Sequence, residues 1–195
     1  MAKEHLRSIA SIPKIIPSLT LRSSKMKAVP KPTNALALLK ADHKKVKELF
    51  DAFGKTKSDS KKQSTVEDAL QELRVHAAIE EEIFYPALRE ALKDKDLLDE
   101  AEEEHRVAKT LIEELVSNGA NTEHFEAKFI VLAENVRHHI KEEEGEMFKQ
   151  ARAAGVDLKA LAEQLYTRKE ELMGDEKALE AAEAASNVKP YQQLG

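Results

Sequence analysis

Two lone histidines in this 195-residue chain are each followed, at nearly the same distance, by a histidine and glutamate pair. The separation is 33 residues in the first half and 34 in the second, and each pair has the spacing His-x-x-x-Glu. Residues four positions apart lie on one face of a helix, so both members of a pair can serve the same ion. The six residues are His43, His76, Glu80, His105, His139 and Glu143.

This residue set predicts a dinuclear metal site. Imidazole nitrogen and carboxylate oxygen suit iron, manganese or zinc, and ligand chemistry alone does not choose among them. The chain has no cysteine, which excludes thiolate sites, iron–sulfur clusters and disulfides. Two antiparallel hairpins related by a pseudo-twofold axis would give each ion two histidines, with Glu80 and Glu143 as bridges.

The segments that carry these residues have apolar side chains at intervals of three and four, as amphipathic helices do. The six polar residues fill gaps in these apolar stripes, so we expect them to point inward. A single inward histidine is usually a hydrogen-bonded core residue, but six buried polar groups cost several kcal/mol each unless something compensates them. In the first segment the stripe contains Leu36, Leu39, Val46, Phe50 and Phe53.

Short connections between such helices predict an all-α fold, an up-down-up-down antiparallel four-helix bundle with a short fifth helix and flexible tails. Hydrophobic residues at 42%, charged residues at 34% and only six glycines and six prolines fit this class. Asn34 or Thr33 is expected to cap the first helix, and Pro86 to end or kink the second. A fifth helix is expected from about Asp157 to Met173.

The predicted organisation has four parts. Residues 34–152 form the metal-binding domain, residues 153–174 the short C-terminal helix, and residues 175–195 an Ala/Glu-rich tail that becomes loose from Ser186. Residues 1–33 carry seven Lys or Arg against Glu4 alone, which predicts a disordered basic leader or, alternatively, an organelle-targeting segment.

Charge and hydropathy limit the partners and the location. The formal net charge is −5, and because the leader is basic the body is strongly acidic, so no nucleic-acid partner is expected. No apolar run approaches the roughly 20 residues of a membrane span, so we expect a soluble, cytoplasmic protein.

Four short runs resemble the hemerythrin-type cation-binding (HHE) family over about residues 34 to 152. They are Leu-Lys-Ala-Asp-His43, His76-Ala-Ala-Ile-Glu80-Glu-Glu-Ile-Phe-Tyr-Pro, Glu-His105 and His139-Ile-Lys-Glu-Glu143. The resemblance implies two iron ions in a non-haem centre, with histidines from all four helices and two bridging carboxylates. It also implies roles in oxygen binding, sensing, iron handling, or oxidative and nitrosative stress response, with dioxygen, nitric oxide or peroxide as ligands.

The chain departs from the oxygen-carrying members of that family at two positions. Their additional third-helix histidine corresponds to Lys109, which argues against reversible oxygen carriage. Their fourth-helix carboxylate corresponds to Glu144, one residue beyond Glu143. We prefer Glu143 because its spacing matches that of Glu80, and Glu144 remains the alternative.

Two other functions stay open at this point. The centre could be that of a di-iron oxidase or peroxidase-like enzyme, with Tyr85 or a neighbouring glutamate handling protons, although a binding or sensing role is preferred. The protein could also be a structural helical adaptor with an inert metal site. Glu81 or Glu104 could be an extra ligand or a proton shuttle, and His138 is expected to face solvent.

Overall fold

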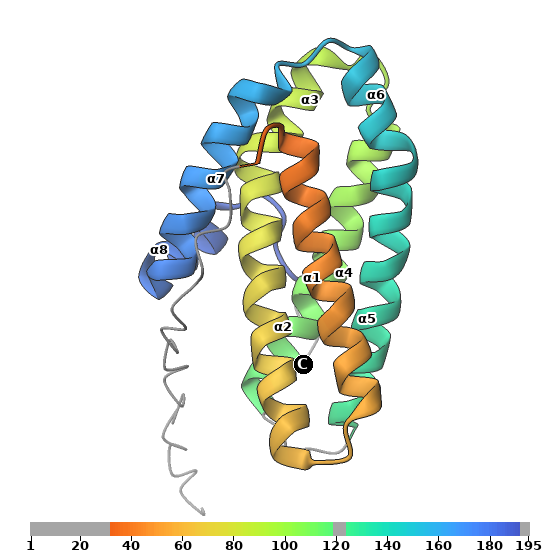
Figure 1. Cartoon of the computed structure of the whole chain (residues 1–195), viewed down its shortest axis with the longest axis vertical. Coiled ribbons are helices and arrows are strands. Elements are labelled where there is room, and N and C mark those ends of the chain that lie inside the picture. The colour runs from red at the N-terminus through yellow and green to blue at the C-terminus, as the bar shows by residue number, and fades with distance from the viewer. Residues whose placement is uncertain (1–31, 119–123, 192–195) are drawn as a thin grey trace, which may run out of the picture.

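The computed structural model describes residues 32–118 and 124–191, and residues 1–31 of the predicted leader lie outside them. Four helical rods stand side by side in antiparallel order (Figure 1), and the described residues contain no strand. The predicted all-α bundle is therefore confirmed. The rods are α1 (Ala35–Lys55), α2 (Asp59–Ile79) continued by η1 (Glu80–Phe84) and α3 (Tyr85–Ala91), α4 (Asp96–Asn118), and α5 (Phe125–Glu142) continued by η2 (Glu143–Met147) and α6 (Phe148–Ala153).

Helix α1 begins where the sequence predicts it. The Asn34 side chain accepts a hydrogen bond from the backbone N–H of Ala37 at 2.9 Å, which satisfies one of the otherwise unpaired amides of the first turn. Thr33 is not the cap. From there the apolar stripe turns inward, and α1 packs along α2 as α4 packs along α5.

The second rod continues past Pro86 instead of ending there. A π-helical turn, η1, lies just before the proline, which occupies the first turn of α3. The fourth rod contains the matching turn η2. Each π turn begins at one of the predicted bridging glutamates, Glu80 and Glu143, and such turns are frequent at functional sites.

Two further helices cover the outside of the bundle. Helix α7 (Leu158–Gly174) corresponds to the predicted fifth helix, is capped by Asp157, and packs against α1 and α2. Helix α8 (Glu176–Ala185) follows it. Beyond α8 the chain differs from the expected loose end, because residues 186–191 lie on α4. Val188 is buried there, and the Tyr191 N–H donates to the Thr110 hydroxyl at 2.8 Å.

The apolar core has two clusters, one at each end of the bundle. One gathers around the π turns and includes Phe84, Tyr85 and Phe148. The other lies toward the α1–α2 and α4–α5 connections and includes Phe50 and Phe129. The histidines and glutamates lie between them.

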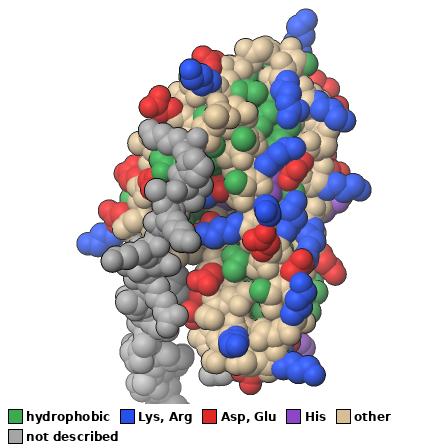
Figure 2. Space-filling view, viewed as in Figure 1, with side chains coloured by type: hydrophobic (Ala, Val, Ile, Leu, Met, Phe, Trp, Pro, Cys, Tyr) green, Lys and Arg blue, Asp and Glu red, His purple; other side chains and the backbone are tan. Residues whose placement is uncertain are grey.

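The surface is mixed in charge. On the face shown in Figure 2, Lys and Arg side chains alternate with Asp and Glu, and hydrophobic groups appear only in small areas. Among the described helices, none is both long enough and apolar enough to span a bilayer.

Candidate metal centre

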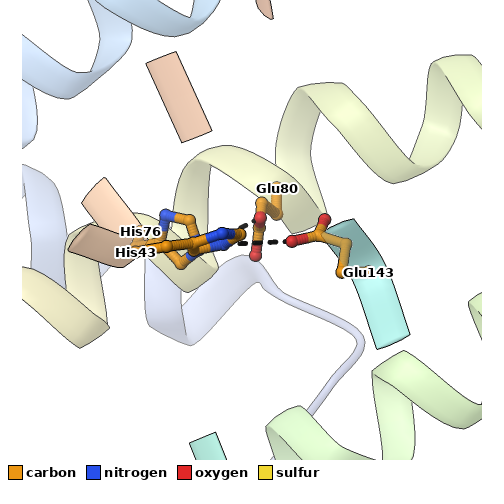
Figure 3. Close-up of side chains that lie close together, drawn as sticks. All are labelled: His43, His76, Glu80 and Glu143. Atoms are coloured by element: carbon orange, nitrogen blue, oxygen red, sulfur yellow. Dashed lines mark hydrogen bonds and ion pairs between the residues drawn. The ribbon is translucent and has the colours of Figure 1, made fainter. Parts of the chain in front are cut away.

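All six predicted ligand residues meet in the middle of the bundle. Each is buried, and Glu80, His43 and Glu143 are the most deeply enclosed, with 0%, 1% and 1% exposure. Figure 3 shows four of them, with the rings of His43 and His76 directed at the two carboxylates. The structure thus brings together side chains that are up to 100 positions apart in the chain.

The six residues form two adjoining groups. In one, potential ligand atoms of His43, His76, Glu80 and Glu143 all lie within 4.8 Å of one another, and in the other the same holds for Glu80, His105 and His139. The Glu80 carboxylate belongs to both. Its Oε1 is 3.1 Å from His76 Nε2, and its Oε2 is 3.4 Å from His105 Nε2. The Glu80 carboxylate could therefore contact a cation in either group.

Several of these atoms are buried without a hydrogen-bond partner. They include Glu80 Oε1, both carboxylate oxygens of Glu143, and His139 Nε2. Buried polar atoms left in this way are costly, and carboxylates facing one another are more so. Two divalent cations would satisfy these atoms, so the residues present fit a dinuclear metal centre.

Without bound cations, the charged side chains of the centre shift one another's pKa values. Burial alone lowers the pKa of His76, but the carboxylates of Glu80 and Asp42 outweigh burial and raise that pKa to about 10. The same balance, with Glu80 and Glu81, raises the pKa of His105 to about 9. Burial and then the charge of Glu80 raise the pKa of Glu143. Protons therefore occupy this centre when cations do not.

Each of the four histidines directs its Nε2 inward and its Nδ1 toward a further carboxylate. Three of these contacts are 3.0 Å or shorter, and the fourth is 3.6 Å. A hydrogen bond between Nδ1 and an acid, as for His43, His105 and His139, fixes the tautomer that leaves the Nε2 lone pair free for a metal. The His76–Asp42 contact is an ion pair without a hydrogen bond, and His76 Nδ1 and Asp42 Oδ2 are both buried without a hydrogen-bond partner. The pairs are His43–Glu144 at 3.0 Å, His76–Asp42 at 3.6 Å, His105–Glu81 at 2.9 Å and His139–Glu104 at 2.8 Å.

These four acids repeat between the two halves. An acid precedes each lone histidine (Asp42 and Glu104), and an acid follows each predicted bridging glutamate (Glu81 and Glu144). The sequence therefore contained a signal for these acids, because each half has an acid-His dipeptide and a Glu-Glu dipeptide. Sequence reasoning missed Asp42 and took Glu81 or Glu104 as an extra ligand or proton shuttle, whereas the structure places both on Nδ1 atoms.

The competing fourth-helix carboxylates occupy different places. Glu143 points into the centre, with Oε2 3.1 Å from His43 Nε2. Glu144 lies outside it, with its side chain 26% exposed and near Lys40 and Lys47. His138, as expected, is outward, with its side chain 59% exposed beside Glu142. The geometry favours Glu143 as the ligand.

The surroundings of the two groups are unlike. The Tyr85 hydroxyl is 3.2 Å from His105 Nε2 and 3.4 Å from Glu80 Oε2. The equivalent residue of the other half is Phe148, whose ring stacks near that of His43 with centroids 6.1 Å apart. Lys109 turns away from the centre, and its Nζ donates to Glu81 at 2.6 Å and to the Val188 carbonyl at 2.9 Å.

A cavity of about 470 Å³ adjoins the centre, and all four histidines contribute to its lining. Nothing in the sequence pattern predicted it.

Comparison with known proteins identifies a family for the segment that contains these six residues. Residues 34–151 match the family model described as the hemerythrin HHE cation binding domain. No curated protein and no solved structure matched the chain.

Proposed function

The chain belongs to the hemerythrin HHE cation-binding family, and from this premise we propose that it is a non-haem di-iron protein. His43, His76, His105 and His139 would hold the two ions, with Glu80 and Glu143 as bridges. The observation that carries the proposal is the set of buried Glu80, Glu143 and His139 atoms without hydrogen-bond partners at the meeting point of four helices.

Iron is favoured over manganese and zinc by the family, since the ligand set suits all three metals. Bound iron supplies a redox-active centre able to bind dioxygen, nitric oxide or peroxide. The chain's own residues set the conditions for it. Glu144, Glu81 and Glu104 orient the imidazoles of His43, His105 and His139. The Tyr85 hydroxyl lies where it can donate a hydrogen bond beside His105.

We place this activity in sensing, iron handling or protection against oxidative and nitrosative stress. Lys109 supports such a role over reversible oxygen carriage. At the position of the additional histidine, its side chain pairs with Glu81 and the C-terminal segment, and so offers no imidazole to the centre.

An oxidase or peroxidase-like enzyme is the second candidate, and two observations favour it. Tyr85 is a buried hydroxyl in contact with His105 and Glu80, where it can hold or pass a proton. The adjoining cavity gives space for a second molecule beside the centre. A binding protein needs neither feature.

Metal analysis of protein purified without chelator tests the proposal, together with absorption spectra of the iron form under nitrogen and after air. About two iron ions per chain and a spectral change on exposure to air are expected. Sustained turnover of peroxide would favour the enzyme. A centre that takes zinc, rejects iron and shows no reactivity would overturn the proposal and favour a structural adaptor.

A further inference from the structure

The cavity next to the centre lies on one side of it only. Toward the π turns, the space beside the histidines is filled by the buried rings of Phe84, Tyr85 and Phe148. In the opposite direction the 470 Å³ cavity extends from the histidines to an opening at the surface, and its inner wall is formed by apolar side chains next to the histidines or one or two turns from them. These are Val46, Leu73, Ala108, Ile112, Val136 and Ile140.

A hollow of this size is not an ordinary packing defect. Protein interiors are close-packed, and voids larger than one water molecule are few and small. Pockets that bind small organic molecules typically have volumes of about 300–1,000 Å³ and mostly apolar walls. The small side chains of Ala77 and Ala108 keep the space open between α2 and α4.

The C-terminal segment forms the outer wall of the cavity. Its lining includes Glu183 and Ala184 at the end of α8, followed by Val188, Lys189 and Pro190. Val188 is buried, and its carbonyl accepts from Lys109 Nζ. The Ser186 hydroxyl also donates to Glu81 at 2.5 Å. This segment is therefore fixed over the opening by specific contacts.

The charges around the opening favour an uncharged occupant. Among the described residues that line it, each Lys and Arg already has an acceptor. Arg74 pairs with Glu176 and Glu183, Lys109 with Glu81, and Lys189 Nζ donates to backbone carbonyls. Glu113 lies exposed at the edge and would repel an anion.

We propose that this cavity binds a neutral, largely apolar organic molecule, with one end against the four histidines and the other under residues 183–190. Whether that molecule is a substrate or an effector rests on the proposed di-iron function. Its binding does not, because the apolar side chains of the wall, from Val46 to Ile140, are present with or without metal.

The test uses the full chain, metal-free and iron-loaded, and N-phenyl-1-naphthylamine, a neutral probe whose fluorescence rises in apolar surroundings. Saturable binding of about one probe per chain is expected in both forms. Ala108→Phe fills the cavity and should weaken binding at least tenfold. Ala127→Phe, which adds the same ring at an exposed position on α5, should leave binding unchanged.

Ile112→Trp fills the cavity farther from the histidines and serves as the second variant if Ala108→Phe does not fold. Circular dichroism and iron content establish which variants are folded. The proposal is overturned if the parent shows no saturable binding, or if a folded filling variant binds the probe as the parent does. Probe binding in a protein that takes up no iron would leave the cavity proposal standing while refuting the di-iron function.

Discussion

Replacing Glu81 by glutamine should lower the metal affinity of one half of the centre and leave that of the other half unchanged. Glu81 Oε1 accepts from His105 Nδ1 at 2.9 Å, and Glu81 Oε2 accepts from Lys109 and Ser186. Glutamine has nearly the same shape and can still accept from Nδ1–H, but it carries no charge. The His105 imidazole then becomes a weaker base, and the ion on His105 and His139 should be held less tightly.

The expected loss of metal affinity depends on how exposed the replaced side chain is. Removing a carboxylate that orients a metal-bound histidine typically lowers affinity by about 10- to 100-fold, which is about 1.4 to 2.8 kcal/mol. Glu81 should fall in the upper part of this range because its side chain is only 5% exposed. The equivalent change, Glu144→Gln, should fall in the lower part because that side chain is 26% exposed and solvent screens its charge.

Competition with a chromophoric chelator measures the two affinities, and Glu82→Gln is the control. Glu82 is adjacent to Glu81 but pairs with Arg168 on the outer surface, so its loss should leave both ions in place. Glu81→Gln should weaken one ion and spare the other, and Glu144→Gln should do the reverse for the ion on His43. Parent affinity for both ions in Glu81→Gln, or an equal loss in Glu82→Gln, would refute the reasoning.

Three further predictions follow from the geometry of the centre. Glu80→Ala or Glu143→Ala should lower the content of both ions, because a bridge serves two cations, whereas His138→Ala should change little; elemental analysis decides, and equal losses would contradict the assignment. Removing the metal should lower the thermal midpoint measured by circular dichroism, since cations bound only by the folded state stabilise it, and an unchanged midpoint would contradict this. In metal-free protein the midpoint should fall further as pH rises from about 7 to 10, because raised pKa values of about 10 for His76 and about 9 for His105 stabilise the fold only while these residues are protonated. A midpoint that rises over this range would show that the charges are not arranged as described.

The bundle and the inward position of the six residues could be predicted because both follow from local periodicity. Apolar residues at helical spacing define the inner face of each rod, so a polar residue within the stripe must point inward as well. His138 and His139 show that this pattern can distinguish adjacent residues. They are adjacent, yet the stripe alone predicted His138 outside, as the structure has it.

The features that escaped prediction depend on contacts between distant segments. Pro86 indicated an interruption, but a π turn that begins at the buried Glu80 precedes it and the rod continues. Val188 is one apolar residue in a polar tail, and its burial depends on the surface of α4. The cavity arises from the summed side-chain volumes of four helices, which no single periodic pattern contains.

The sequence repeat suggests two equal halves of the centre, but the structure gives the halves different neighbours. Tyr85 places a hydroxyl 3.2 Å from His105 Nε2, whereas Phe148 presents only an apolar ring to His43. Glu81 is held by Lys109 and the C-terminal segment, whereas Glu144 is partly open to solvent. A polar ligand on the His105 side would thus meet a hydroxyl donor where the equivalent position beside His43 has an apolar ring. The C-terminal segment contacts that same side, so the half of the centre best equipped for chemistry is also the half connected to the wall of the cavity.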